Sequence, residues 1–303
     1  NLEEGVLRCG SHQHQHAILH GVQQRVLLAA VEAVDLVDEQ DGAQTERRQA
    51  LVAWCVVTLG TTALALAVYL TLRAFSPLLA GAWNFLVLYL ALGFRELARD
   101  FHDIQTALRV DDLSRARGCA ARWRSDAAAA TSAADIAAIV VEESLLRGHQ
   151  RVFGVLACYV LLPGPAGAVL YRVAEALMSA WGRSETPESP HFAAFSRQAY
   201  AVIDWFPKRL TAAAFATTGD FENAIYCWRT QVSESRDGEA GGVDHPAAIV
   251  LASGAGALGV RLFNGRFGVG PLADCDALRR VSGLLARVVV LWLLVLMLLS
   301  VAQ

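Results

Sequence analysis

Residues 50–72 read ALVAWCVVTLGTTALALAVYLTL and contain no charged side chain. As an α-helix this run would be about 34 Å long, because each residue adds about 1.5 Å. That length is enough to cross the ~30 Å hydrocarbon core of a bilayer with a slight tilt. Arg47 and Arg48 come immediately before the run. The stretch therefore predicts a membrane-spanning helix.

The composition of the 303-residue chain favours the same class of protein. Hydrophobic residues make up 54% of it and charged residues only 18%, whereas soluble domains carry about 25% charged residues. The apolar residues gather in uncharged runs that arginine-rich stretches separate. The formal net charge of -3 gives no sign of a nucleic-acid partner. We expect an all-α, polytopic helical membrane protein whose partner is the lipid bilayer.

Two more uncharged runs predict further spans. Residues 74–94 follow the first run after Arg73, so we expect a helical hairpin with its turn at Arg73. Residues 288–303 are leucine-rich and follow Arg287. With residues 281–286 included, and with the Arg287 side chain snorkelling toward the interface, this run is also long enough to span.

A fourth uncharged run, residues 152–171, contains Pro163-Gly164-Pro165 in its middle. Proline removes a backbone donor and clashes with the preceding turn of a helix. At membrane depth the freed backbone must contact protein or water. We therefore expect a broken span or a re-entrant hairpin. Residues 246–260 are short and rich in Gly and Ala, which predicts a packed half-helix or a second re-entrant element.

Two polar regions separate these runs. Residues 95–151 contain nine arginines and, by the positive-inside rule, predict a cytoplasmic helical region. Apolar residues recur there at helical spacing from Phe94 to Leu108, and Asp112 is placed to cap a following helix. Residues 182–204 include the loop-like sequence TPESP at 186–190.

The first 46 residues have no long apolar run, and no signal peptide can be recognised in them. We expect residues 1–46 to be an unmatched, poorly ordered segment and residues 47–303 to form one membrane domain. His12, His14, His16 and His20 lie in the first segment. Histidine-rich tracts sometimes bind metal but are more often solvated, so we assign no metal ligand.

The sequence from Gly254 to Gly259, GAGALG, matches the G-x-G-x-x-G dinucleotide pattern. That pattern indicates a nucleotide site only between a strand and a helix of a βαβ unit. This chain has no alternating pattern of strands and helices. Small residues also let helices approach closely, so we expect a helix-packing role here.

The segment DWFPKRLT, which begins at Asp204, is the most informative local cluster. A proline near a helix start, followed by Lys208 and Arg209, suits an anion held near helix-terminal N–H groups. A phosphate or a lipid headgroup would fit. In the alternative interpretation the segment is an interfacial anchor, with Trp205 in the headgroup zone.

Glu142 and Glu143 lie near Arg147, His149 and Arg151 in the sequence. Such carboxylates supply magnesium ligands or transfer protons in many enzymes. Charged residues beside a span are more often interfacial and paired. The chain contains no G-x-S-x-G, P-loop or H-E-x-x-H pattern.

From about Arg48 to its end, the chain resembles the CobD/CbiB family of membrane proteins, including the AmpE-like branch. Residues 205–212, WFPKRLTA, resemble the W-x-P-x-R-L-T-A box of that family, and residues 256–261, GALGVR, resemble its G-A-L-G-V-R/Q stretch. Glu143-Ser144 before the run at 152–171, and Tyr171-Arg172 at its end, fall in the family's order and spacing.

The resemblance implies a multi-pass protein of the bacterial inner membrane that is linked to cobalamin biosynthesis. Family members include adenosylcobinamide-phosphate synthases, which use ATP and magnesium to join a corrinoid carboxylate to an aminopropanol arm through an amide bond. On this basis the catalytic candidates are Glu143 and Asp204. The substrate- or phosphate-binding candidates are Arg172, Lys208, Arg209 and Arg261. ATP, magnesium and a corrinoid would be the ligands of an active synthase.

Some positions depart from the synthase pattern. Arg147 and Arg151 stand where synthase members have acidic residues, in a pattern like E-S-x-x-E-N-x-x-D-G, and apolar residues 247–253 replace an S-P-N-A-G segment. These departures resemble the AmpE-like branch, for which a membrane signalling or accessory role without defined catalysis is implied. The sequence therefore leaves two hypotheses open, a synthase-like ligase and a non-catalytic membrane protein.

Overall fold

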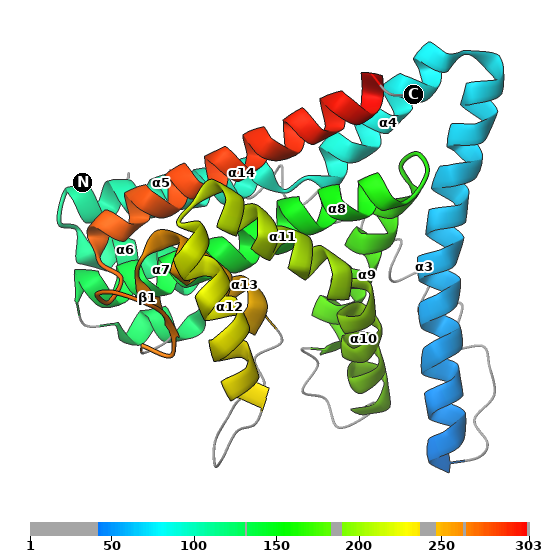
Figure 1. Ribbon diagram of the computed structural model, residues 1–303. Helices are drawn as coiled ribbons and strands as arrows, with labels where there is room; N and C mark the ends of the chain where they lie inside the picture. Colours follow the sequence, from blue (N-terminus) through cyan, green and yellow to red (C-terminus); the bar gives the residue numbers. More distant parts are fainter. Residues whose placement is uncertain (1–41, 131, 183–189, 237–246, 263–264, 302–303) are drawn as a thin grey trace, which may run out of the picture.

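The computed structural model describes residues 42–130, 132–182, 190–236, 247–262 and 265–301, and these form a nearly all-helical protein (Figure 1). The N-terminal histidine group and most of the TPESP sequence lie outside the described residues. The elements are α3 (Gly42–Phe75), α4 (Pro77–Ala91), α5 (Phe94–Arg109), α6 (Leu113–Ala121), the 3₁₀-helix η1 (Ser125–Ala129), α7 (Ala133–Gly148), the π-helix η2 (His149–Phe153), α8 (Gly154–Leu161), α9 (Ala166–Gly182), α10 (Pro190–Ile203), α11 (Trp205–Thr218), α12 (Phe221–Arg236), α13 (Ala248–Leu258), β1 (Arg261–Leu262), β2 (Phe267–Gly268) and α14 (Cys275–Val301).

Helix α3 is the longest helix, and in Figure 1 it stands along one side of the protein and packs against α9 and α10. Its part from Arg48 to Phe75 is long and apolar enough to cross a membrane. The expected hairpin is present, but its turn lies at Ser76 rather than at Arg73, which is in the last turn of α3. The reason is Pro77, which fits the first position of a helix because the missing N–H would have no partner there.

Helix α4 covers only 15 residues and is shorter than the uncharged run that predicts it. It packs against α3 and α9. The indole Nε1 of Trp83 donates a hydrogen bond to the carbonyl of Ala65 at 3.3 Å, which joins the two helices of the hairpin.

Helix α14 is the second helix long and apolar enough to cross a membrane, over Cys275–Leu299. It packs against α7, α11 and α13. The prediction of a long apolar helix near the C-terminal end of the chain is confirmed. Arg287, expected to snorkel, donates from Nη1 to the carbonyl of Thr218 at 2.6 Å and so satisfies the C-terminal end of α11.

The expected break in the run at 152–171 is present. Helix α8 ends at Leu161, and α9 begins at Ala166 after the Pro163-Gly164-Pro165 turn, in which Gly164 has a φ of 61°. On the other side of α8, the π-helix η2 joins α7 to α8 without a gap. A π-turn accommodates an extra residue and shifts the direction of the side chains that follow.

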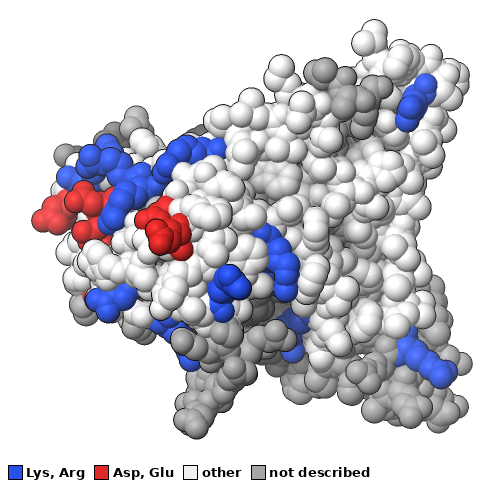
Figure 2. Space-filling model, in the orientation of Figure 1, with Lys and Arg blue, Asp and Glu red and all other residues white. Residues whose placement is uncertain are grey.

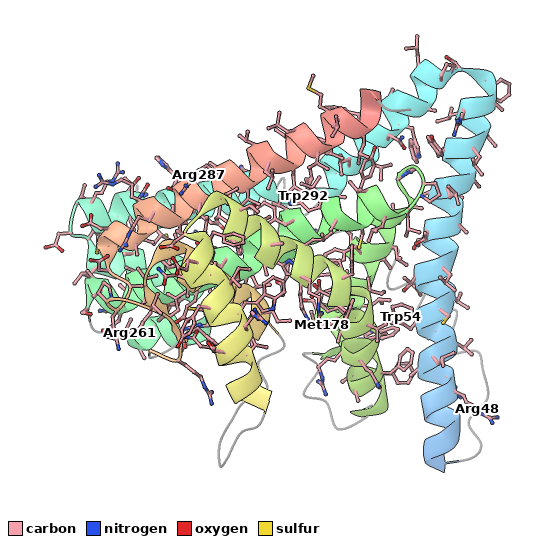
Figure 3. The ribbon with its side chains drawn as sticks, viewed as in Figure 1. Arg48, Trp54, Met178, Arg261, Arg287 and Trp292 are labelled. Carbon is pink, nitrogen blue, oxygen red and sulfur yellow. The ribbon has the colours of Figure 1, made fainter. Side chains whose placement is uncertain are left out.

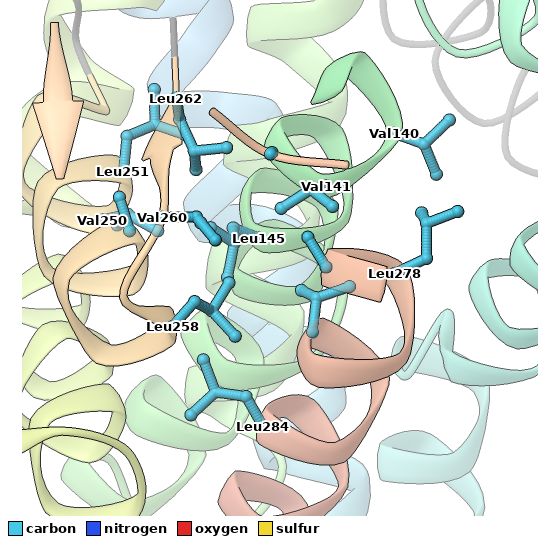
Figure 4. Packing of buried hydrophobic residues seen from close by; sticks show 14 of the residues in the cluster. Val140, Val141, Leu145, Val250, Leu251, Leu258, Val260, Leu262, Leu278 and Leu284 are labelled. Atoms are coloured by element: carbon cyan, nitrogen blue, oxygen red, sulfur yellow. The ribbon is translucent and has the colours of Figure 1, made fainter. Parts of the chain in front are cut away.

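The arginine-rich region contains α5 and α6, as its periodicity predicts, and it also contains η1 and α7. Ile104 of α5 is fully buried, and the side chain of Asp112 caps α6 by accepting a hydrogen bond from the Arg115 amide at 3.0 Å. Figure 4 shows the apolar packing behind this region. There, Val141 and Leu145 of α7 lie against side chains from α13 and α14.

Helix α13 is the buried half-helix that the sequence allowed for, and it packs on α7, α11, α12 and α14. A Cβ atom on Gly254 would lie 2.8 Å from Leu145 Cδ1, and one on Gly256 would lie 2.5 Å from the carbonyl oxygen of Asn223. Gly254 and Gly256, the first two glycines of the G-x-G-x-x-G match, are therefore sites of close helix packing, as expected. Gly259, with a φ of 63°, ends the helix.

The all-α prediction misses one small sheet. Strands β1 and β2 pair antiparallel, with Arg261 opposite Gly268. The main chain of Arg261 also donates to Pro271 at 2.7 Å and accepts from Ala273 at 3.2 Å. Two-residue strands are too short to show the alternating pattern by which a strand is recognised in sequence. This compact turn holds Arg261 in place.

Candidate functional site

A cavity of about 840 Å³ opens between α7 and the segment that follows α13. One side is formed by α7, including Glu142 and Glu143, and the other by Leu251, Arg261 and Leu272 with their neighbours. Small-molecule sites usually have volumes of about 300–1,000 Å³. The cavity is therefore large enough for a substrate-sized ligand. Figure 3 shows Arg261 in the part of the protein remote from Arg48.

Both glutamates of the cavity are paired with arginines. Arg124 donates from Nη1 to Glu142 at 2.8 Å and from Nε to Asp126 at 2.8 Å. Arg147 donates from Nε to Glu143 at 3.1 Å and lies 5.1 Å from the centre of the Trp123 ring. The paired charges explain how the mostly buried Glu142 is tolerated.

Glu143 has the electrostatic properties of a group that can exchange protons. Burial raises the pKa of Glu143, and Arg147 and Arg124 offset only part of that effect. A carboxylate with a raised pKa accepts or donates a proton more readily near neutral pH than an exposed one. Arg261 lies exposed in the same cavity, and its guanidinium forms no ion pair with the residues that the structure describes. Its position on the cavity lining lets it contact an anion there.

The donors of the cavity do not fit a magnesium ion. Magnesium prefers octahedral oxygen ligands that include carboxylates. In the described part of the chain, no three His, Cys, Asp or Glu side chains are grouped to hold a metal. The two glutamates face guanidinium groups instead. The cavity lining holds two arginines, Arg124 and Arg261, and four carboxylates, of which Asp126, Glu142 and Glu143 are paired with arginines.

A second polar cluster is buried between helices and centres on Asp204. Its Oδ1 lies 2.9 Å from His149 Nε2 and accepts a hydrogen bond from the Tyr171 hydroxyl at 2.9 Å. Its Oδ2 lies 3.2 Å from Lys208 Nζ. The other nitrogen of the His149 ring, Nδ1, lies 2.9 Å from the hydroxyl of Thr211. These side chains, with Tyr200, form what we call the Asp204 cluster.

The Asp204 cluster joins four elements and is almost closed to solvent. His149 belongs to η2, Tyr171 to α9, and Lys208 and Thr211 to α11, while Tyr200 of α10 lies 2.9 Å from the Tyr171 hydroxyl. Burial alone would raise the pKa of Asp204, but His149, Lys208 and Tyr171 outweigh it and hold the pKa below its usual value. The carboxylate is therefore ionised and balances Lys208.

The six predicted site residues fall into separate places. Glu143 and Arg261 line the cavity, and Asp204 and Lys208 form the ion pair of the Asp204 cluster. Arg172 and Arg209 do not line the cavity. Arg172 pairs with Glu175 at 2.6 Å on its own helix. The Arg209 guanidinium lies 3.8 Å from the centre of the ring of the exposed Trp205.

Sequence reasoning did not select Arg124, His149 or Thr211 as site residues. Arg124 lies 18 residues before Glu142, and His149 lies 62 residues before Thr211. No spacing rule connects residues this far apart. The only available signal was that Thr211 and Tyr171 stand in the motifs that carry the family resemblance.

The fold and the cavity define a helical protein with two long apolar helices and a charged site of small-molecule size. The model of the CobD/Cbib protein family matches residues 14–271. The chain therefore belongs to the CobD/CbiB family, as the resemblance indicated. The matched range includes residues 14–46, and the domain boundary at residue 46 stays a prediction.

Two relatives carry the same name. The chain is 32% identical over 217 residues to the cobalamin biosynthesis protein CobD of Chromobacterium violaceum, covering 68% of this chain and 67% of that protein. It is 32% identical over 222 residues to the cobalamin biosynthesis protein CobD of Stutzerimonas stutzeri, covering 71% and 67%. No solved structure matches the chain.

Proposed function

We propose that this protein acts in cobalamin biosynthesis as a multi-pass protein of the bacterial inner membrane. The family and the names of the two relatives support the pathway. Helices α3 and α14 support the membrane location, because each is long and apolar enough to span a bilayer. In this arrangement the arginine-rich region from α5 to α7 is cytoplasmic, and the turn between α8 and α9 is re-entrant.

The surface of the protein is consistent with lipid around one part of it. Large apolar side chains are exposed on three helices, for example Leu64 of α3 (66%), Phe85 of α4 (74%) and Leu298 of α14 (70%). Figure 2 shows few charges over α3 and α4, whereas basic and acidic residues gather at the opposite end of the protein. Contiguous apolar surface of this kind marks contact with a membrane or another protein.

We expect the full-length chain to stay in the membrane fraction after washing with alkaline carbonate, and to need detergent for extraction. Exposure of the leucines of α3 and α14 to water would be unfavourable by about 25 cal/mol per Å² of apolar surface. A peripheral protein of the same cells serves as the control, because carbonate releases it. Monodisperse protein in buffer without detergent would contradict the proposed location.

For the chemistry, we propose a ligase reaction in the cavity. A corrinoid carboxylate activated by ATP is attacked by the amine of an aminopropanol arm, so that an amide bond forms and the activating phosphate leaves. Glu143 accepts the proton that the amine loses, and Arg261 and Arg124 hold the anionic leaving group. The observation that carries this proposal is the presence, in one cavity, of a glutamate with a raised pKa and an arginine that forms no ion pair with the described residues.

Complementation of a bacterial strain that lacks its own synthase tests this proposal. We expect the parent chain to restore cobalamin-dependent growth, and the Glu143→Ala and Arg261→Ala variants to fail because the proton acceptor and the anion contact are lost. Glu222→Ala and Arg279→Ala serve as matched controls, since both side chains are exposed and remote from the cavity lining. Membrane levels of every variant are measured by immunoblot.

A non-catalytic accessory or signalling role, as in the AmpE-like branch, is the second candidate. It is favoured by the pairing of Glu142 and Glu143 with arginines and by the poor fit to magnesium. The same experiment separates the two. If the parent chain reaches the membrane at normal levels and does not restore growth, the ligase proposal is wrong and the accessory role is supported.

A further inference from the structure

The two sides of the cavity are carried by α7 and α13, and both helices are attached to α11. On one side, α7 continues without a gap into η2, in which Nδ1 of His149 lies 2.9 Å from the hydroxyl oxygen of Thr211 in α11. On the other side, the hydroxyl of Ser253 in α13 donates to the carbonyl of Ala212 at 2.8 Å. Thr211 and Ala212 are consecutive residues. Two buried hydrogen bonds therefore connect the two sides of the cavity through one turn of α11.

Apolar packing and hydrogen bonds both contribute to the relation between these helices. Leu145 of α7 lies against Gly254 of α13, and this contact sets how closely the two helices approach. The dispersion attraction in such a contact has little dependence on direction. Hydrogen bonds are directional and weaken steeply when they are bent. The bonds at Thr211 and Ala212 therefore add a directional constraint to the packing of α7 and α13.

The Asp204 cluster holds the His149 ring in the orientation that this attachment needs. Nε2 of the ring lies 2.9 Å from Asp204 Oδ1 and Nδ1 lies 2.9 Å from the Thr211 hydroxyl, so both nitrogens have a polar partner and the plane of the ring is fixed. Asp204 itself is held by Lys208 and by the Tyr171 hydroxyl. Every buried polar group of this arrangement has a partner, as a rigid polar network requires.

We infer that His149 and Thr211 are positioning residues, which fix the separation of Glu143 and Arg261 across the cavity by coupling α7 to α13 through α11. An effect of this coupling on catalysis rests on the proposed function, since the cavity is the proposed reaction site. The coupling itself is a property of the fold. It can be measured without a substrate.

The test uses spin labels on two exposed cavity-lining positions, Ala134→Cys in α7 and Leu272→Cys on the opposite side, in a full-length chain with Cys9, Cys55 and Cys275 replaced by serine. Pulsed electron paramagnetic resonance of the detergent-solubilised protein gives the distance distribution between the labels. We expect Thr211→Val to shift or broaden this distribution by about 2 Å, the scale of helix shifts at packed interfaces.

The matched control is Thr218→Val on the same helix, because the Thr218 hydroxyl bonds only to the carbonyl of Ala214 within α11. It is expected to leave the distances unchanged. Thr211→Ser retains the hydroxyl and is expected to restore the parent distribution. A purely stabilising role for Thr211 would lower the unfolding temperature without moving the distances, and that result would overturn the inference.

If Thr211→Val does not fold, Ser253→Ala tests the same coupling from the α13 side. It removes the bond to Ala212 and leaves the Asp204 cluster intact. Unchanged distances in this variant would also overturn the inference. The outcome is independent of complementation: altered distances in a chain that does not restore growth support the coupling and contradict only the ligase proposal.

Discussion

Asp204→Asn will lower the free energy of unfolding by about 3–5 kcal/mol, the usual cost of removing one partner from a buried ion pair. Asparagine keeps the shape of the side chain but removes its charge. Lys208, whose side chain is 11% exposed, would then carry an unbalanced charge in the interior. His149 and Tyr171 would also lose a charged acceptor. Unfolding by denaturant in detergent, followed by tryptophan fluorescence, measures the change.

Asp220→Asn is the matched control for this prediction. Asp220 is exposed and caps α12 by accepting from the Asn223 amide at 3.1 Å. Asparagine caps a helix about as well as aspartate, so we expect a change within about 0.5 kcal/mol. The double variant Asp204→Asn/Lys208→Met should recover much of the lost stability, because it removes the unbalanced charge. Equal stability of the Asp204→Asn and Asp220→Asn proteins would show that the cluster does not stabilise the fold.

The pH dependence of this difference has a definite sign. The pKa of Asp204 is lowered from its ordinary value of 3.8, so the folded state favours the ionised carboxylate. The stabilisation is therefore fully present above pH 3.8 and is lost as the pH falls through the lowered pKa. The difference in stability between the parent chain and Asp204→Asn should narrow as the pH falls through this lowered pKa.

Gly256→Ala will destabilise the protein by about 1–3 kcal/mol, the usual cost of adding a methyl group where there is no space. The new Cβ would lie 2.5 Å from the carbonyl oxygen of Asn223 and 2.8 Å from the Cα of Ala224. Both atoms belong to the backbone of α12, which a side-chain rotation cannot move. Helices α12 and α13 would have to separate.

The same substitution at Gly118 has the opposite expected sign. Gly118 lies in α6 with nothing within 4 Å of its Cβ position. Alanine there should raise stability by about 0.5–1 kcal/mol, because glycine costs a helix that much relative to alanine. The two thermal midpoints, measured in the same detergent, give the comparison. Similar effects at both positions would mean that α12 and α13 are not in close contact.

Local chemistry was sufficient to predict the long helices and the breaks. Residues 50–72 contain no charged side chain and residues 281–301 contain only Arg287. An apolar run of this length is typical of a helix that can span a membrane, and α3 and α14 are these helices. Pro163-Gly164-Pro165 breaks the run at 152–171 because proline cannot continue the hydrogen-bond pattern. The same rule applied to Pro77 would have placed the hairpin turn at Ser76. A turn at Arg73 is expected only from the charge of that residue, which lies in the last turn of α3.

The site was only partly predictable. Glu143 and Arg261 were chosen from their motifs, and they line one cavity. Asp204 and Lys208 are four residues apart, which places their side chains on the same face of a helix, so their ion pair follows from this spacing. The contact of His149 with Asp204 joins residues that are 55 positions apart in the sequence. The ion pair of Arg124 with Glu142 joins residues that are 18 positions apart.

The sequence by itself determined the family, the nearly all-helical class and the two helices that can span a bilayer, because motif order, hydropathy and proline positions are local properties. Only the tertiary structure decided which charges meet, and which atoms of α7 and α12 lie against Gly254 and Gly256. Pairings of this kind depend on how helices cross and on the shift that the π-helix η2 introduces between α7 and α8. Those relations arise only when the whole chain packs.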